Sequence, residues 1–312
     1  MKPIALTAAA CVLAILFIAI AFLYSQQQQA PRNTTSTTIA YSTTTVIPIP
    51  SNGTNQSVRI RWMIESSSLN ALINLNATLA KAAFDNPGTF VLDGNPPLGW
   101  TSKRMKTVHS YDQLLLFLNS SGSAEYNGVM LDQENWSFTP SYEQHNSVYY
   151  TMLSENLSHS KGMVFAASPA IDLMNSLGYH SNQPVMFEQL GIAGNTSKYA
   201  DIYELQAQRM GQNSSEFYNF SIFEYNHVKR SNPHALFFIG LSTNIAGGEN
   251  ITANALYNDV NSTRGFAAGY WLNVPNTSAY CPTCGKSRPE VAMELLRMLY
   301  GKSLQSGSNA IA

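Results

Sequence analysis

The chain has 312 residues, a formal net charge of −1 at pH 7 and only 12% charged residues. Phosphate recognition needs clustered lysine and arginine, so this composition argues against a nucleic-acid partner. The six histidines give no pair at metal-binding spacing, and the chain has neither a nucleophilic-serine elbow nor a phosphate-binding glycine loop. We therefore expect neither a metal nor an organic cofactor. The sequence leaves the oligomeric state open.

The N-terminal part of the chain divides into a membrane segment and a polar stalk. Ile4–Tyr24 is an uncharged, mostly apolar run, long enough to cross a bilayer as a helix, and no small-residue cleavage site follows it. We predict an uncleaved single-pass transmembrane anchor over residues 1–24, with a cleaved signal peptide as the alternative. Lys2 places the rest of the chain on the extracytoplasmic side of the cell membrane. Residues 25–57, rich in Thr, Ser and Gln, are predicted to form a disordered stalk.

From residue 58 onward, short apolar strands alternate with amphipathic helices. Strands are predicted at Val58–Ile64, Thr89–Leu92, Lys106–His109, Gly128–Leu131, Met163–Ala167, Tyr199–Leu205, Ala235–Leu241 and Ala267–Leu272. Helices are predicted at Leu69–Phe84, Tyr111–Asn119, Tyr142–Ser160, Ala170–Leu177, Glu216–Arg230, Leu256–Thr263 and Arg288–Leu299. Such alternation predicts an α/β fold with a parallel sheet, and this number of strands favours a (β/α)8 TIM-type barrel over residues 58–303. Residues 304–312 are predicted to be a flexible tail.

The fourth predicted strand ends in two acids, Asp132 and Glu134. Side chains two apart on a strand share a face, so these carboxyl groups lie close enough to perturb each other's pKa. Trp136 follows them. Paired acids are what glycosidic-bond hydrolysis needs, since one protonates the leaving oxygen while the other stabilises developing positive charge. The alternative is a solvated strand end with two unrelated acids.

Active sites of such barrels lie at the carboxyl ends of the strands. The residues at those predicted ends are Asp132, Glu134, Ser168, Glu204, Gln206, Ser242, Asn244, Trp271 and Asn273. The stretch 203–208 alternates, so we predict that Gln208 shares a strand face with Glu204 and Gln206. These residues form a polar bowl with a tryptophan, which suits a glycan substrate. The alternatives are a core role for Trp271 and a polar strand edge for the glutamate and glutamines.

Two cysteines, Cys281 and Cys284, lie three residues apart near the C-terminus. A zinc site would need a second ligand pair nearby, and none is visible, so we predict a local disulfide in a surface loop. Thirteen Asn-x-Ser/Thr sequons run from Asn33 to Asn276, and this density favours an exported glycoprotein. A glycan on Asn135 would obstruct the predicted site, so we expect that asparagine to be unmodified.

Several strand ends together resemble family-18 glycoside hydrolases, the chitinases and chitinase-like lectins. The segment 127–134, Asn-Gly-Val-Met-Leu-Asp-Gln-Glu, is similar to their Asp-Gly-x-Asp-x-Asp-x-Glu strand. The runs 165–169, 238–241 and 265–271 resemble three later strands, the last of which ends in Trp271 under the reactive sugar. The resemblance spans residues 58 to 300 and implies a TIM barrel.

The resemblance also implies roles for individual residues. Glu134 takes the place of the general acid, and Asp132 that of the aspartate that orients the substrate's N-acetyl group. The two earlier aspartates are replaced by Asn127 and Met130. An acetamide-binding tyrosine is missing from the strand matched by residues 199–208, where Gln206 or Gln208 stands instead.

The resemblance implies retaining, substrate-assisted hydrolysis of N-acetylhexosamine-containing glycans, without a cofactor. A non-catalytic carbohydrate-binding surface protein is the alternative. A third possibility is a carboxylate metal site made of Asp132, Glu134 and Glu204, because hard cations take oxygen ligands.

Overall fold

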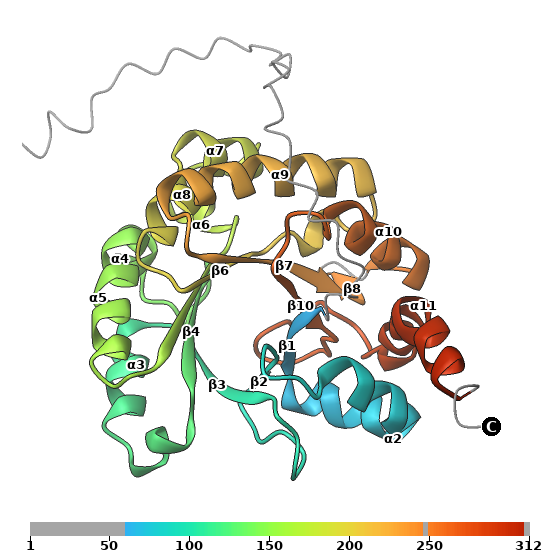
Figure 1. The fold of residues 1–312 in the computed structure, drawn as a ribbon. Coiled ribbons are helices and arrows are strands. Elements are labelled where there is room, and N and C mark those ends of the chain that lie inside the picture. Colours follow the sequence, from blue (N-terminus) through green and yellow to red (C-terminus); the bar gives the residue numbers. More distant parts are fainter. Residues whose placement is uncertain (1–59, 246–248, 309–312) are drawn as a thin grey trace, which may run out of the picture. The chain divides into compact units, whose positions relative to one another are not determined.

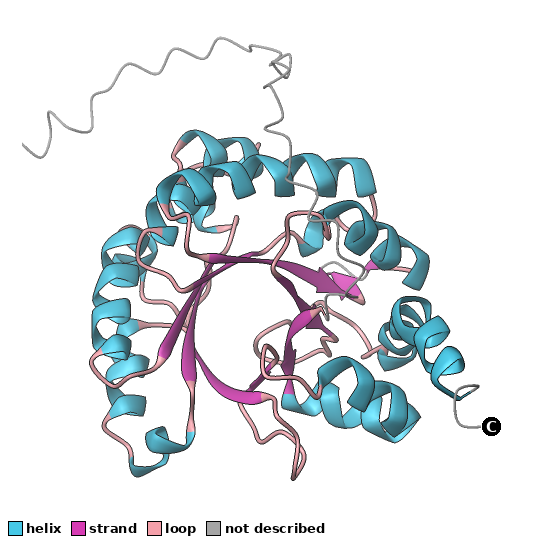
Figure 2. Ribbon diagram, viewed as in Figure 1, coloured by secondary structure: helices cyan, strands magenta, loops and turns pink. Residues whose placement is uncertain are grey.

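The computed structural model describes residues 60–245 and 249–308. Its main strands form a closed barrel in the order β1-β10-β7-β6-β5-β4-β3-β2, with parallel pairing between neighbours. Helices surround this barrel (Figure 1). Figure 2 shows the strands, in magenta, as a ring inside the cyan helices. The predicted eight-stranded parallel α/β barrel is confirmed.

The barrel strands are β1 (Arg61–Glu65), β2 (Phe90–Leu92), β3 (Lys103–Val108), β4 (Gly128–Gln133), β5 (Val164–Pro169), β6 (Ile202–Leu205), β7 (Leu236–Ser242) and β10 (Gly269–Asn273), and β8 (Asn244–Ile245) pairs with β9 (Glu249–Asn250) outside the barrel. The helices are α2 (Ser66–Phe84), α3 (Tyr111–Leu118), α4 (Ser141–Gln144), α5 (Ser147–His159), α6 (Leu173–Ser176), α7 (Gln183–Gln189), α8 (Ile192–Ser197), α9 (Ser214–Ser231), α10 (Ala253–Thr263) and α11 (Pro289–Ser308), with 3-10 turns η1 (Ser121–Glu125) and η2 (Gln208–Met210).

Strand β4 shows how the apolar runs build the barrel. Alternate side chains of a strand face opposite ways. Val129 and Leu131 pack outward in one apolar cluster with Leu114 of α3. Met130 faces inward and packs with Met63 in the barrel interior. Because both faces are covered, the strand reads as a continuous apolar run up to the point where its inward side turns polar.

Polar side chains fix where helix α3 begins. Ser110 accepts a hydrogen bond from the Gln113 N–H, and the Glu143 carboxylate accepts one from the Tyr111 N–H at 3.0 Å. Both contacts satisfy N–H groups that lack a partner within the helix. The capping contacts of Ser110 and Glu143 therefore fix the start of helix α3 close to the carboxyl end of β3.

Three differences from the predicted elements go beyond a shift of one boundary. The single helix predicted at Tyr142–Ser160 is divided into α4 and α5. Helices α7 and α8 were not predicted, and they end so close to β6 that this strand begins at Ile202 rather than Tyr199. Helix α2 is interrupted at Asn76, where the backbone is not helical and the side chain accepts a hydrogen bond from the Leu79 N–H at 3.0 Å.

The predicted anchor, Ile4–Tyr24, and the predicted stalk lie outside the described residues. Within the described part, no helix is both long and apolar enough to span a membrane. Helix α11 continues to Ser308, into the segment predicted as a tail.

Candidate active site

The inward side of β4 carries two acids at its carboxyl end. Met130 faces the barrel interior, so Asp132 faces it too, and Glu134 follows just past the strand. Only 4% of Asp132 is exposed, and Glu134 is half-buried. The two carboxyl groups interact, as the charge of Asp132 contributes to the raised pKa of Glu134.

Groups from two neighbouring strands hold the Asp132 carboxylate. Gln206, just after β6, donates from Nε2 to Asp132 Oδ1 at 2.7 Å. The Ser168 hydroxyl of β5 lies 3.4 Å from the same oxygen and 2.7 Å from Glu204 Oε2. A serine has one proton to donate, so the shorter contact, with Glu204, is its main hydrogen bond. One network thus joins four residues from three strand ends.

Glu134 is set up to hold a proton. Burial, followed by the charges of Asp132 and Asp172, raises the pKa of Glu134 to about 9, although a hydrogen bond from Gln206 opposes the shift. At neutral pH the carboxyl group is therefore protonated, which is the state that a general acid requires. Asp172 itself accepts a hydrogen bond from the Asn135 N–H at 3.0 Å and lies 3.6 Å from Arg209.

Glu204 is a second protonated acid in the network. Burial raises its pKa to about 8, against the hydrogen bond from Ser168. Its Oε1 has no hydrogen-bond partner among the described residues. Gly240 of β7 provides the space: a Cβ there would lie 2.7 Å from Glu204 Oε1 and 2.4 Å from Gln208 Nε2. Both side chains therefore pack against a position that only glycine can occupy without displacing them.

The predicted placement of Gln208 on the β6 strand is wrong. The strand ends at Leu205, and the chain turns, with the Ala207 N–H donating to the Leu205 carbonyl at 2.8 Å. Gln208 begins the turn η2 instead. It nevertheless reaches the site, because its amide lies against Gly240 beside Glu204.

Two further groups at the barrel mouth, His109 and Glu65, were not singled out from the sequence. His109 Nδ1 lies 3.5 Å from Asp132 Oδ2. Burial lowers the pKa of His109, but the hydrogen bond and charge of Asp132 outweigh it, so the pKa is raised. Burial and the charges of Asp93 and Asp132 raise the pKa of Glu65 to about 7. Both residues stand at the ends of predicted strands, so the same inward alternation would have found them.

A segment between β10 and α11, residues 274–288, crosses the mouth; we call it the strap. In the barrel order, β10 and β4 lie opposite each other, four strands apart in either direction. The strap residue Tyr280 nevertheless reaches the β4 side, where its ring centroid lies 4.7 Å from that of Phe138 and 5.8 Å from that of Trp136. It also lies 5.3 Å from the ring of His109. These four rings form an aromatic cluster at the mouth, and His109 links it to Asp132.

Two features hold the strap in place. Cys281 and Cys284 form a disulfide, with their Cα atoms 5.4 Å apart. The buried amide of Asn244 donates to the Cys284 carbonyl at 2.6 Å and to the Lys286 carbonyl at 3.2 Å. Asn244, which we predicted to line the bowl, is only 2% exposed, and its Nδ2 is engaged by the strap backbone.

The remaining predicted site residues take mixed places. Trp271 is only 6% exposed and packs inside the barrel with Phe238, the core role that we kept as an alternative. Its Nε1 has no partner among the described residues. Asn273, half-buried, stands at the end of β10 in register with Ser242. The indole N–H of Trp136 donates to Thr139 Oγ1 at 2.9 Å.

The two departures from the family-18 strand lie away from the network. Met130 fills the barrel interior, and the Asn127 side chain accepts a hydrogen bond from the Arg104 N–H at the other end of the strand. The carboxylate that would sit beside Asp132 along β4 is absent. Gln206, Ser168 and His109, from other strands, surround Asp132 instead.

The described residues bring no group of three or more His, Cys, Asp or Glu into a metal-binding arrangement. The acids of the mouth interact through hydrogen bonds and charge, as above. The carboxylate metal site considered from the sequence therefore gains no support.

No protein family model and no curated protein matches the chain. Among solved structures, it is similar to triosephosphate isomerase from Bartonella henselae, with 9% identity, a TM-score of 0.43, and coverage of 77% of this chain and 98% of that one. The N-terminal domain of a putative aldolase from Bacteroides vulgatus gives 10% identity, a TM-score of 0.42, and coverage of 79% and 81%. A sugar phosphate isomerase/epimerase from Parabacteroides distasonis gives 10% identity, a TM-score of 0.39, and coverage of 81% and 97%. Likeness at this level carries no information on substrate or reaction.

Proposed function

We propose that the protein is a glycoside hydrolase that acts on N-acetylhexosamine-containing glycans by a retaining, substrate-assisted mechanism. The observation that carries the proposal is the pair at the end of β4. Glu134 has a pKa of about 9, so it keeps its proton at neutral pH. Beside it, the Asp132 carboxylate accepts a hydrogen bond from Gln206 at 2.7 Å. A proton donor next to a positioned carboxylate is the arrangement that glycosidic-bond cleavage requires.

In the proposed reaction, Glu134 gives its proton to the glycosidic oxygen as the bond to the anomeric carbon breaks. The carbonyl oxygen of the substrate's own acetamide attacks that carbon from the other side, and Asp132 accepts a hydrogen bond from the acetamide N–H. Water then opens the cyclic intermediate and gives a proton to the Glu134 carboxylate, which restores the acid. Substrate assistance of this kind is a recognised exception to the scheme with two carboxylates.

The setting of the enzyme is also part of the proposal. The uncharged run Ile4–Tyr24, the polar stalk and the dense sequons support a barrel held outside the cell by an N-terminal anchor. Protease added to intact cells should then remove the barrel domain. Complete protection of the domain would overturn this orientation.

The test is release of a chromogenic leaving group from a panel of β-linked N-acetylhexosaminides and plain hexosides. Glu134→Gln should lower the rate by about 10²–10⁴-fold, the usual effect of losing a positioned proton donor. Glu224 of α9 offers a control, because burial raises its pKa to about 8 as well, yet its charged neighbour is Glu188 of α7, in the helical layer and not at the mouth. Glu224→Gln should leave the rate unchanged. Hydrolysis that survives Glu134→Gln would remove Glu134 from the mechanism.

A non-catalytic carbohydrate-binding protein is the second candidate. It is favoured by the aromatic rings at the mouth, where Tyr280 of the strap, 56% exposed, packs on Phe138 and His109. Aromatic rings offer the flat apolar surface on which the C–H faces of sugars pack. Glycan binding by the wild-type protein, with no turnover on any member of the panel, would favour this candidate over the hydrolase.

A further inference from the structure

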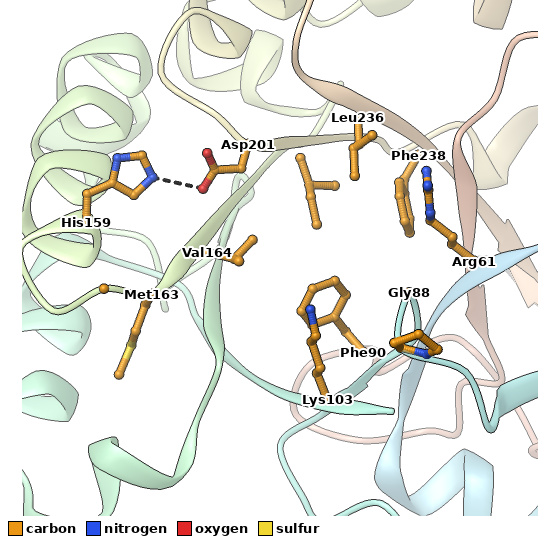
Figure 3. A pocket seen from close by; sticks show the side chains of 13 residues that line it. Arg61, Gly88, Phe90, Lys103, His159, Met163, Val164, Asp201, Leu236 and Phe238 are labelled. Atoms are coloured by element: carbon orange, nitrogen blue, oxygen red, sulfur yellow. Dashed lines mark hydrogen bonds and ion pairs between the residues drawn. The ribbon is translucent and has the colours of Figure 1, made fainter. Parts of the chain in front are cut away.

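The barrel has a cavity of about 740 Å³ at the end opposite the candidate active site. It is lined by residues at the amino-terminal ends of the strands, including Arg61 of β1, Phe90 of β2 and Lys103 of β3. Figure 3 shows these side chains around the cavity. A volume of this size is typical of small-molecule sites.

The cavity is separated from the candidate active site. Met63 and Met105 follow Arg61 and Lys103 by two residues, so they occupy the next inward layer toward the mouth. With Met130 they fill the barrel interior, and all three have 0% exposure. A ligand in this cavity would therefore contact none of the acids discussed above.

Most of the cavity wall is apolar. The side chains of Phe90, Val164, Ile202, Leu236 and Phe238 line it, and all five belong to the apolar filling of the barrel interior or pack against it. The two phenyl rings offer flat contact surfaces. A flat apolar body would therefore gain by leaving water for this cavity.

Two cationic side chains stand at the rim of the apolar wall. The Lys103 ammonium lies 5.8 Å from the centre of the Phe90 ring. Arg61 passes over Gly88, where a Cβ would lie only 2.7 Å from the arginine Cγ. Within the described residues, neither cation forms an ion pair. Both charges are therefore available to a ligand.

Among the described residues, the one carboxylate that lines the cavity, Asp201, already has hydrogen-bond donors within the protein. Asp201, on another wall, accepts from His159 Nε2 and from the Phe165 N–H, both at 2.8 Å. Figure 3 shows the pair of Asp201 and His159 apart from Arg61 and Lys103. The asymmetry leaves net positive charge beside an apolar wall, which favours an anion.

We propose that this cavity binds a small organic anion with a flat apolar body, of the aromatic carboxylate class. The planar guanidinium of Arg61 matches a carboxylate in two parallel hydrogen bonds, and Lys103 adds a second charge. The rings of Phe90 and Phe238 contact the apolar body. This site is independent of the proposed hydrolase activity.

The test is calorimetric titration of the full-length protein with naphthoate, and with naphthylmethanol as its neutral analogue. Naphthoate should bind with one molecule per chain, and Arg61→Gln or Lys103→Gln should each raise its Kd about tenfold or more. Gly88→Ala should also weaken binding, because the added Cβ displaces Arg61 without changing any charge. Lys286→Gln, an exposed lysine on the strap, and Glu134→Gln should leave the Kd unchanged.

Three outcomes would overturn the proposal. The first is equal affinity for naphthoate and naphthylmethanol, since the cations would then contribute nothing. The second is an unchanged naphthoate Kd in both Arg61→Gln and Lys103→Gln, with circular dichroism showing that both variants are folded. The third is a wild-type protein that does not bind naphthoate.

Discussion

At the scale of single residues, the candidate site is a set of carboxyl groups in different surroundings. Asp132 contacts donors on neighbouring strands, whereas burial leaves Glu134 and Glu204 protonated at neutral pH. A pair of acids whose surroundings differ in this way can divide the roles of proton donor and positioned carboxylate. The sequence spacing of Asp132 and Glu134 predicts their shared face, but not the partners that distinguish them.

The raised pKa of Glu134 predicts how the activity depends on pH. An acid with a pKa of about 9 keeps its proton below that pH and loses it above. The ratio kcat/KM for a chromogenic N-acetylhexosaminide should therefore fall above about pH 9. Glu204→Gln is the control, because it removes the other protonated acid of the network. The alkaline fall should persist in that variant, and its disappearance would assign the titration to Glu204 instead.

Gln206 should act on catalysis through Asp132. Its amide donates to Asp132 Oδ1 at 2.7 Å, and a hydrogen bond to a charged group contributes about 1.5–3 kcal/mol. Gln206→Ala should therefore lower kcat by roughly tenfold to a hundredfold, while KM changes little. Gln189→Ala, at an exposed position on α7, should be neutral. An unchanged kcat in Gln206→Ala would mean that other contacts suffice to hold Asp132.

At the scale of elements, the apolar runs predict most of the strands, because each barrel strand is buried on both faces. The boundaries follow less well. Gln208 alternates with Gln206 in sequence, yet the strand stops at Leu205, where a turn replaces the ladder. Helices α7 and α8 were not predicted because they are short, with 7 and 6 residues, too few to show a helical period of apolar residues.

The contacts of the strap with distant parts of the chain could not be predicted from the sequence. The spacing of Cys281 and Cys284 predicts a local loop, but not that Tyr280 beside it reaches the rings of His109, just after β3, and Phe138, in the segment after β4. Asn244 likewise looks like a site residue in sequence, and only the structure reveals that its amide serves the strap. Contacts between segments far apart in sequence depend on loop conformation, which local patterns do not encode.

Asn244 is predicted to keep the strap ordered. Its amide bonds to the strap carbonyls of Cys284 and Lys286, so Asn244→Ala leaves both without this donor. Hydrogen exchange of the strap amides, including the Thr277 N–H that bonds to the Gly285 carbonyl at 2.8 Å, should become faster. Asn254→Ala, at an exposed position on α10, is the control. Unchanged exchange in Asn244→Ala would contradict the prediction, because the other strap contacts, including those of Arg288 Nη1 with the Thr243 and Ile251 carbonyls, would then suffice.

At the scale of the whole molecule, carboxyl groups that form no ion pair with another described residue are spread through the barrel mouth and the helical layer. Burial is the largest cause of a pKa raised to about 7 for Glu65, Glu143, Glu188 and Asp259, to about 8 for Glu204 and Glu224, and to about 9 for Glu134. Both carboxyl oxygens of Glu224 lack any hydrogen-bond partner among the described residues. Such groups are tolerated in the fold as neutral acids.

The sign of the resulting pH dependence follows from proton binding. In the unfolded chain these acids titrate near their ordinary values of about 4, so between pH 4 and 9 the folded state binds more protons than the unfolded state. The stability that they contribute is therefore fully present below about pH 4 and is lost as the pH rises through the folded pKa values, from about 7 to about 9. The raised pKa values of His109 and His159 act in the same direction.

We predict that the free energy of unfolding of the full-length protein, measured by urea titration, falls steadily between pH 5 and pH 9. Few ion pairs oppose this trend, and exposed pairs contribute little. Glu224→Gln removes one buried acid while keeping its shape, so it should reduce the fall. The free energy of unfolding of the variant, compared with that of the wild type, should therefore be more favourable at pH 8 than at pH 5. Glu290→Gln, at an exposed position on α11, should leave the profile unchanged. A free energy of unfolding that rises from pH 5 to pH 8 would contradict the prediction, because it would require the unfolded chain to bind more protons than the fold.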